Sequence, residues 1–208
     1  MTGQNSRVPQ VMRPRGVAGR IVYAMMNKGH KPIYENVARV LDPQPNDELL
    51  EVACGNGYFL ERYASQVHSV AGLDLSELGI RLASKRHADR IAEGTGDFVH
   101  GAAAELPWAE DRFTAVVSMG GFSGFSRAED SLGEIHRVLR PGGRAVVSIE
   151  YNAEDGRDHT RESLKYGFRI WTEQEVRTLF QAAGFSECGI SYAKAMGMPK
   201  MMLVRALK

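Results

Sequence analysis

The sequence predicts an α/β fold: a mostly parallel sheet of seven strands, with helices on both faces and an antiparallel last strand. Two observations lead to this prediction. Downstream of Asn46, short apolar runs alternate with longer amphipathic runs, the pattern of parallel strands joined by crossover helices. The last two apolar runs are separated only by a short turn at 197–199, too short for a crossover helix, so these two strands should pair antiparallel.

The individual elements follow from the same patterns in chain order. Each short apolar run is expected to form a buried strand, which gives the ranges 48–53, 67–73, 97–100, 113–119, 144–150, 185–192 and 201–207. Each longer amphipathic run is expected to form a helix, which gives 58–65, 78–91, 128–139 and 173–183. Gly184 would end the last helix as a C-terminal cap. His87 falls on a surface-like part of helix 78–91, and no chemical role is expected for it.

Composition excludes several classes of protein. The chain has 208 residues, enough for one domain, and 43% hydrophobic residues, enough for a core. Its 26 basic and 25 acidic residues nearly cancel, which argues against a globally basic nucleic-acid binder. No apolar stretch approaches the ~20 residues that a membrane span needs. Cys54 and Cys188 form neither a disulfide framework nor a zinc cluster, so a reducing, cytoplasmic location and no metal are expected.

Residues 1–45 are expected to form an N-terminal arm with lid-like helices, and residues 46–208 the main domain. The segment before Glu35 is basic and has no acidic residue. Within it, apolar residues share one helical face: Val17, Ala18, Ile21, Val22, Met25 and Met26. The favoured interpretation is a helix packed on the domain with a solvated basic face; a lid or a membrane-surface element is the alternative. The apolar run is too short and interrupted for a secretory signal.

A glycine turn is the most informative local feature. The apolar strand 48–53 runs into Gly55 and Gly57 and then directly into a helix. In a parallel sheet such a turn lies at the carboxyl edge, where ligands bind, and glycine lets the backbone approach a ligand closely. Asp74 ends the next strand, where a carboxylate could accept both hydrogen bonds of a ribose diol. The alternative role for Asp74 is the N-cap of the following helix, although Ser76 could fill it.

Two other nucleotide-binding motifs do not fit this turn. A dinucleotide-binding G-x-G-x-x-G would need its third glycine at Leu60. A phosphate-binding P-loop would need a Gly-Lys-Ser/Thr sequence, and none follows the turn.

Four segments between Asn46 and the end of the sequence carry a resemblance to a known family. They are 51–57 (EVACGNG), 72–76 (GLDLS), 101–108 (GAAAELPW) and 134–143 (EIHRVLRPGG). In this order and at these separations they resemble class I S-adenosylmethionine-dependent methyltransferases. The resemblance is greatest to the small methyltransferase-domain group that includes ubiquinone/menaquinone-type enzymes. It implies a Rossmann-like sheet and S-adenosyl-L-methionine as the cofactor.

The resemblance also implies roles for individual residues. Glu51 and the turn Gly55–Gly57 would hold the methionine part of the cofactor. Asp74 would bind the ribose hydroxyls and Leu75 would pack on the adenine. Ala103 would donate its backbone N–H to the adenine edge.

The chain departs from the family pattern at two positions. Ala53 replaces the first glycine of the loop, a small change that the turn could accommodate. Ala102 stands where the family often has an acidic residue for the adenine amino group. Backbone contacts or Glu105 would then have to recognise the adenine.

Methyl transfer from a sulfonium requires mainly positioning and exclusion of water, so the absence of a catalytic triad does not argue against an enzyme. The candidate catalytic residues are His30 in the N-terminal turn, Tyr151 after the fifth strand, and His159 in the polar stretch beyond it. Met119 ends the fourth strand, and the two glycines after it would leave room beside the methyl group. An apolar pocket or ordinary core is expected from Met25, Met26, Phe122 and Phe125.

The function expected from these features is transfer of a methyl group to an oxygen, nitrogen or carbon of a small molecule. Nucleic-acid methylation is not expected, because no Asn/Asp-Pro-Pro-aromatic sequence follows the fourth strand. One alternative is a phospholipid N-methyltransferase that uses the basic N-terminal helix at a membrane, although peripheral membrane contact is the less favoured expectation. The other is a cofactor-binding protein without activity, suggested by Ala53 and Ala102.

Overall fold

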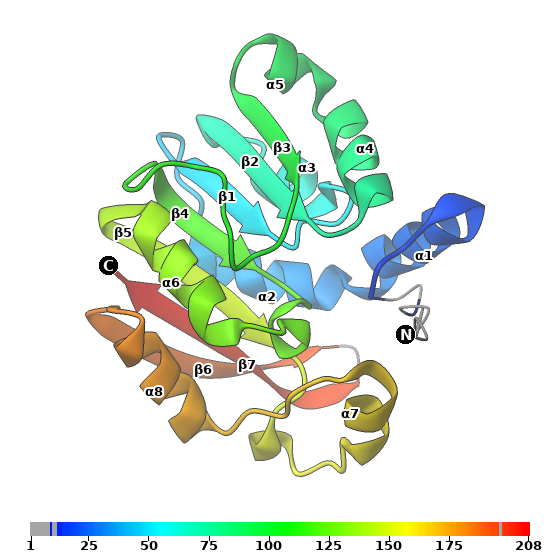
Figure 1. The fold of residues 1–208 in the computed structure, drawn as a ribbon, viewed down its shortest axis with the longest axis vertical. Coiled ribbons are helices and arrows are strands. Elements are labelled where there is room, and N and C mark those ends of the chain that lie inside the picture. Colours follow the sequence, from blue (N-terminus) through cyan, green and yellow to red (C-terminus); the bar gives the residue numbers. More distant parts are fainter. Residues whose placement is uncertain (1–8, 10–11, 196) are drawn as a thin grey trace, which may run out of the picture.

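The computed structural model describes residues 9, 12–195 and 197–208. Seven strands in this part of the chain form one sheet in the order β3-β2-β1-β4-β5-β7-β6 (Figure 1). Their bounds are β1 (Glu48–Val52), β2 (Ser69–Asp74), β3 (Gly96–His100), β4 (Phe113–Ser118), β5 (Leu139–Ile149), β6 (Glu187–Ala195) and β7 (Met198–Leu207).

The strand directions confirm the predicted topology. β1 pairs in parallel with β2 and β4, β2 with β3, and β4 with β5. β7 runs antiparallel to both β5 and β6, as the short link between the last two strands predicts. The sheet therefore has a parallel part, whose strand ends meet at one carboxyl edge, and an antiparallel extension.

Helices cover both faces of the sheet. They are α1 (Gly16–Gly29), α2 (Lys31–Leu41), α3 (Tyr58–Tyr63), α4 (Glu77–Arg86), α5 (Ala88–Ala92), α6 (Ala128–Val138), α7 (Thr160–Tyr166) and α8 (Glu173–Ala182). One apolar core joins the sheet to α6 and α8, through residues such as Leu132 and Phe180. The second joins the other face to α2 and α3, through residues such as Val37 and Phe59. Helix α2 is thus part of the second of these two apolar cores.

Helix 78–91 is interrupted at His87, which separates α4 from α5 and has φ −108° and ψ 27°. Contrary to expectation, His87 is buried, because the interruption turns its ring inward onto Phe98 at a centroid distance of 4.9 Å. Its Nε2 donates to the carbonyl oxygen of Gly57 at 2.9 Å. Burial lowers the pKa of His87, which favours the neutral ring. The role of His87 is to hold the glycine turn against α4.

α1 is oriented differently from the favoured interpretation of the sequence. Its buried residues are Gly19 and Tyr23, whereas Val17, Ile21 and Met25 are exposed to solvent. Part of the apolar face that should have packed on the domain therefore points away from it, whereas Val22 and Met26 are half-buried. Helix α7 was not predicted, because its segment is polar and has no apolar repeat. Among the described residues, no helix is both long and apolar enough to cross a membrane.

Candidate functional site

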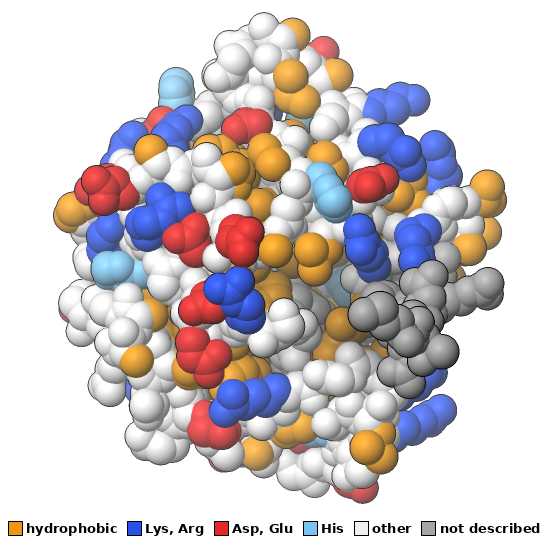
Figure 2. All heavy atoms as spheres, in the orientation of Figure 1, with side chains coloured by type: hydrophobic (Ala, Val, Ile, Leu, Met, Phe, Trp, Pro, Cys, Tyr) orange, Lys and Arg blue, Asp and Glu red, His pale blue; other side chains and the backbone are white. Residues whose placement is uncertain are grey.

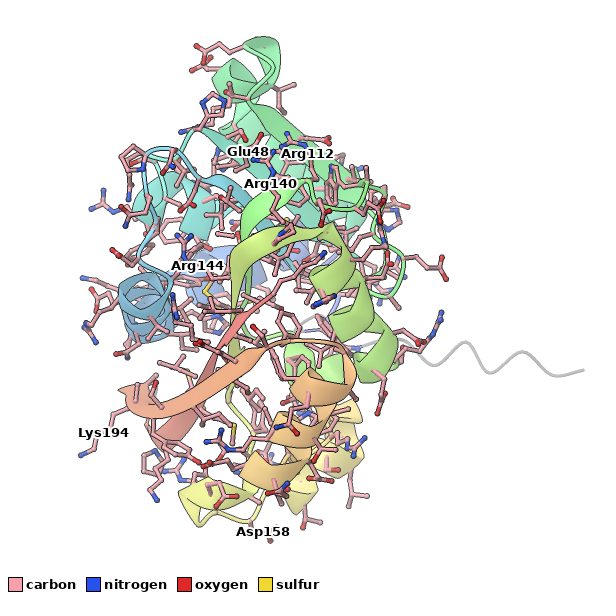
Figure 3. The ribbon with its side chains drawn as sticks, turned by 90° about the vertical axis from the view of Figure 1, so that its left-hand side faces the viewer. Glu48, Arg112, Arg140, Arg144, Asp158 and Lys194 are labelled. Carbon is pink, nitrogen blue, oxygen red and sulfur yellow. The ribbon has the colours of Figure 1, made fainter. Side chains whose placement is uncertain are left out.

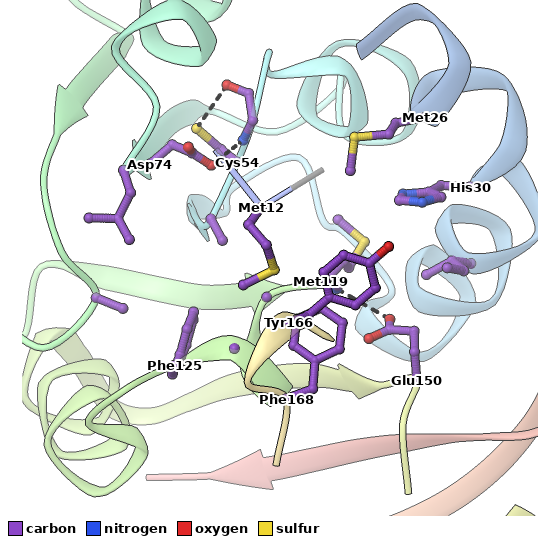
Figure 4. A pocket seen from close by; sticks show the side chains of 18 of the residues that line it. Met12, Met26, His30, Cys54, Asp74, Met119, Phe125, Glu150, Tyr166 and Phe168 are labelled. Carbon is purple, nitrogen blue, oxygen red and sulfur yellow. Dashed lines mark hydrogen bonds between the residues drawn. The ribbon is translucent and has the colours of Figure 1, made fainter. Parts of the chain in front are cut away.

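A cavity of about 620 Å³ lies where the carboxyl ends of β1, β2, β4 and β5 meet (Figure 4). α1, α2 and α7 contribute further parts of its lining. The carboxyl edge is the expected place for a ligand in such a sheet, and the size suits a cofactor-sized molecule.

The glycine turn after β1 and the end of β2 are joined by one carboxylate. Asp74 Oδ2 accepts a hydrogen bond from the Gly55 N–H at 2.8 Å, and Oδ1 accepts one from the Ser76 N–H at 2.7 Å. Burial raises the pKa of Asp74, and the two backbone N–H groups partly offset this rise. Ser76, not Asp74, caps α4, because its Oγ accepts from the Gly79 N–H at 3.1 Å. Asp74 is therefore left lining the cavity.

Glu51 on β1 is a buried carboxylate without a complete set of partners. It is only 3% exposed, it lines the cavity, and its Oε2 has no hydrogen-bond partner in the described part of the chain. Burial, together with the neighbouring Asp74 carboxylate, raises the pKa of Glu51 well above its ordinary value. A buried acceptor with this geometry is best satisfied by a cationic or N–H-bearing group.

The glycines of the turn differ in what they face. A Cβ on Gly55 would lie 3.0 Å from the Tyr23 ring, so the turn and α1 approach closely there. Gly57 does not line the cavity: a Cβ on it would meet the Ala83 Cβ and the His87 ring at 3.1 Å. Gly57 has φ 69°, so glycine is required by backbone and packing together.

The predicted adenine end is formed by Leu75, Ala102 and Ala103, which all line the cavity. Leu75 is 55% exposed, consistent with an apolar surface open to a ligand. Glu105 does not line the cavity and forms an exposed ion pair with Arg127 at 3.3 Å. In this structure Glu105 is thus not available to replace the acidic residue missing at Ala102.

The three predicted catalytic residues line the same cavity, together with Met119. His159 is buried, and its Nε2 lies 3.0 Å from both carboxylate oxygens of Asp155. Tyr151 packs against the edge of the His159 ring at 5.5 Å. His30 lies across the cavity on the turn between α1 and α2, and burial lowers its pKa.

Of the four apolar residues expected in a pocket or the core, Met26 and Phe125 line the cavity. Phe122 is fully buried among core aromatic rings, as the core alternative predicted. Met25 is 69% exposed and belongs to neither, because it lies on the outer face of α1.

Glu150 is a site residue that the sequence reasoning missed. It follows β5, is 5% exposed and points into the cavity near Met119 and Tyr166 (Figure 4). Its Oε1 accepts hydrogen bonds from Ser148 Oγ at 2.5 Å and from the Gly120 N–H at 3.2 Å. Burial is the largest influence on Glu150 and raises its pKa to about 6. The available signal was an acidic residue at the carboxyl end of an otherwise apolar strand.

Asp155 is the second missed residue, and it positions His159. The sequence offered only a spacing of four residues in a polar stretch, which is common by chance. In the described part of the chain no three His, Cys, Asp or Glu side chains lie close enough together to hold a metal ion.

Comparison with known proteins identifies the domain. Residues 50–147 match the family model described as "Methyltransferase domain". The chain is 35% identical over 119 residues to phthiotriol/phenolphthiotriol dimycocerosates methyltransferase of Mycobacterium tuberculosis, covering 56% of this chain and 42% of the relative. It is 36% identical over 104 residues to demethylmenaquinone methyltransferase of Renibacterium salmoninarum, covering 50% of this chain and 41% of the relative. The matches thus span less than half the length of these curated relatives.

The fold has close counterparts among solved structures. Geranyl diphosphate C-methyltransferase from Streptomyces coelicolor A3(2), solved with Mg²⁺, geranyl diphosphate and S-adenosyl-L-homocysteine, superposes with a TM-score of 0.71. The superposition covers 93% of this chain and 84% of that one at 15% sequence identity, a level that shows the fold alone. Taken with the matched domain and the sheet order, these similarities support a class I S-adenosylmethionine-dependent methyltransferase.

Proposed function

We propose that this protein transfers a methyl group from S-adenosyl-L-methionine to a small, largely apolar acceptor. The observation that carries this proposal is the pair of carboxylates, Glu51 and Asp74, on opposite sides of the glycine turn in one cavity. The free Glu51 oxygen suits the ammonium group of the methionine part. Asp74 suits the ribose diol, and Leu75 the adenine.

The cofactor, when bound, supplies an activated methyl group on a sulfonium. This chain then has to hold the acceptor, exclude water and take up a proton where the acceptor loses one. Helix α1 and the α1–α2 turn close one side of the cavity, which supports the exclusion of water. Glu150 is the buried carboxylate at the acceptor end, and a pKa of about 6 leaves it mostly ionised at pH 7 and able to accept a proton.

The chemical class of the acceptor follows from the walls of that end of the cavity. They are apolar or aromatic at Met26, Met119, Phe125, Tyr166 and Phe168 (Figure 4). Such walls favour a lipid, an isoprenoid or an aromatic molecule that carries one polar group. The names of the two curated relatives, which refer to phthiotriol/phenolphthiotriol dimycocerosates and to demethylmenaquinone, support the same class.

Calorimetric titration with S-adenosyl-L-homocysteine tests the cofactor part of the proposal. Asp74→Asn keeps an acceptor oxygen for one of the two backbone N–H groups, loses the acceptor for the other and removes the negative charge. We expect its affinity to fall about 10- to 100-fold, the usual effect of losing hydrogen bonds to a charged group. Asp130→Asn, on the exposed face of α6, is the matched control and should bind normally. Equal affinities for the two variants would remove Asp74 from the ribose-binding role.

Turnover is tested with radiolabelled S-adenosyl-L-methionine and a panel of short-chain hydroquinones, phenols and hydroxylated lipids. Methylation of at least one member above the level seen with Asp74→Asn is expected. Tight cofactor binding without turnover on the whole panel would favour the alternative of an inactive cofactor-binding protein.

A further inference from the structure

Helix α1 exposes a row of apolar side chains, the apolar stripe, to solvent. Val17, Ile21 and Met25 are spaced four residues apart, so they share one helical face, and they are 77%, 58% and 69% exposed. The opposite face carries Gly19 and Tyr23, which are buried against the domain. Scattered apolar residues are normal on a surface, but three aligned along one helix indicate an interaction site.

The charges around this stripe are mainly basic. α1 carries Arg20 and Lys28 and no acidic residue. Neither side chain forms an ion pair within the described part of the chain. At 100° per residue, Lys28 projects from within the stripe and Arg20 projects from its border. Figure 2 shows apolar side chains at the exposed end of α1, with Lys and Arg side chains beside them. Long basic side chains at the edge of an apolar stripe are typical of helices that lie in a membrane interface.

The elements packed against α1 do not reverse this charge. α4 contributes Glu77 as its one acidic residue and two basic residues, Arg81 and Lys85, besides Arg86, which pairs with Glu61 of α3. On α2, Glu35 pairs with Lys31 of the same helix at 3.6 Å. The surface around the stripe thus complements an anionic partner.

α7 presents a second, similar surface beyond the cavity. Its Leu164 is 83% exposed, the largest value among the exposed large apolar side chains of the described residues. The helix carries Arg161 and Lys165 near it, and Glu162 as its one acidic residue. α1 and α7 lie on the same side of the molecule (Figure 1). Both helices line the cavity with their inner faces, through Met26 on α1 and Tyr166 on α7. The two helices that expose these apolar side chains therefore also form walls of one cavity.

We propose that α1 and α7 bind the surface of an anionic lipid bilayer, so that an apolar acceptor enters the cavity from the membrane. Val17, Ile21, Met25 and Leu164 would insert among the acyl chains near the headgroups, while the basic side chains contact anionic lipids. The entry of the acceptor rests on the proposed function; the binding of the bilayer does not. This orientation explains why the cavity has apolar walls next to helices that have apolar outer faces.

Vesicle flotation tests the proposal directly, with vesicles of phosphatidylcholine alone and of phosphatidylcholine with 30 mol% phosphatidylglycerol (about one lipid in three, an ordinary anionic content). The unaltered protein should float with the anionic vesicles and less with the neutral ones. Val17→Ser with Ile21→Ser and Met25→Gln should reduce binding at least ~10-fold, because it removes the inserted groups. Arg20→Gln with Lys28→Gln should reduce binding roughly 5-fold per charge.

The matched control is Ile91→Ser, an exposed apolar residue of α5, a helix outside both proposed membrane-binding helices, at the top of Figure 1; it should leave binding unchanged. Equal flotation of the triple variant and the unaltered protein would overturn the proposal, as would failure of the unaltered protein to bind either vesicle. Sedimentation that shows a dimer dispersed by the triple variant, without vesicle binding, would instead assign the stripe to a second copy of the chain.

Titration with S-adenosyl-L-homocysteine separates this proposal from the proposed function. The triple variant should bind the cofactor product normally, because none of its three positions lines the cavity. Vesicle binding by a protein that does not bind the cofactor product would support the membrane surface and contradict the methyltransferase activity. Binding of the cofactor product without vesicle binding would contradict the membrane surface and leave the proposed methyltransferase activity supported.

Discussion

Ala53 has a backbone conformation that normally belongs to glycine. Its φ is 63°, in the left-handed region, where the Cβ of an L-residue crowds the following carbonyl oxygen. The consequence extends to the next loop, because a Cβ on Gly121 would lie 2.8 Å from the Cβ of Ala53. The alanine after β1 therefore makes glycine necessary after β4. The methyl group of Ala53 thus constrains which residue the loop after β4 can carry at position 121.

Replacing Ala53 by glycine should stabilise the protein. The left-handed conformation costs alanine about 1–2 kcal/mol, and the greater freedom of glycine in the unfolded chain offsets about 0.5–1 kcal/mol of the gain. The net effect expected in urea unfolding is about +0.5–1 kcal/mol. Ala102→Gly, at a residue with ordinary backbone angles, should be neutral or slightly destabilising. A loss of stability in Ala53→Gly would show that the methyl contact outweighs the backbone cost.

Glu150 gives the protein a pH-dependent stability that its glutamine variant should lack. A carboxyl group whose pKa rises from 4.5 to about 6 on folding stabilises the folded state below pH 4.5, and this contribution is lost as the pH rises through 6. Relative to Glu150→Gln, the unaltered protein should therefore lose about 1 kcal/mol between pH 5 and pH 8. Parallel stability curves for the two proteins would contradict a raised pKa.

Turnover of the unaltered protein should increase through pH 6, and Glu150→Gln should abolish that increase.

At the scale of elements, α1 is held to the domain by few side chains. Gly19 allows close approach, since a Cβ there would lie 2.8 Å from Leu78 of α4. Tyr23 fills the space over the glycine turn, close to Gly55 and Gly79. The rest of α1 is exposed or borders the cavity, so this helix should be able to detach without unfolding of the sheet.

Tyr23→Ala should release α1 selectively. Losing a buried aromatic ring costs about 3–5 kcal/mol when the site cannot collapse, and here the cost should fall mainly on the attachment of α1. Hydrogen–deuterium exchange of residues 16–29 should accelerate at least ~10-fold while strands β1, β4 and β5 keep their protection. Ile21→Ala, on the exposed face of α1, should change neither the exchange of residues 16–29 nor the protection of these strands. A uniform acceleration over the whole sheet would show that Tyr23 belongs to the main core.

The sequence predicts the elements that depend on local pattern and misses those that depend on contacts. Strands such as β2 and β4 are found because each is a mostly apolar run, and the short turn between the last two strands reveals that they pair antiparallel. The break at His87 is not visible in the sequence, because it follows from a ring contact with Phe98 on another element. The site shows the same division: Glu51 and Asp74 lie at strand ends, whereas Asp155 is recognisable only beside His159 in space.

At the scale of the whole molecule, one arginine joins three segments that are distant in sequence. Arg144 on β5 donates from Nε to the Leu41 carbonyl at 2.7 Å, and its Nη1 donates to Asp47 Oδ1 at 3.0 Å. It thereby fixes the end of α2 and the start of β1 to the centre of the sheet (Figure 3). Burial alone would raise the pKa of Asp47, but hydrogen bonds from Arg144 and other donors hold it below its ordinary value.

Arg144→Ala should destabilise the whole protein by about 3 kcal/mol, because it leaves a buried carboxylate without its partner. For a chain of this length the midpoint of thermal unfolding should fall by about 6–12 °C. The control is Arg112→Ala, whose partner is Glu48 and whose side chain is 42% exposed; it should cost less than about 1 kcal/mol. Because the pKa of Asp47 is lowered by folding, the effect of Arg144→Ala should be present above pH 3.8 and diminish in stronger acid. An equal loss in both variants would contradict this special role of Arg144.

The position of β7 between β5 and β6 has a consequence for biosynthesis. Among the strands that the structure describes, β6 pairs with β7 alone, and one edge of β5 is covered only by β7. During translation β5 is synthesised well before β7, so it presents an open edge until residues 198–207 follow. The nascent protein therefore passes through an interval in which this edge of β5 is unpaired. Chaperones that shield strand edges would act on this chain in that interval.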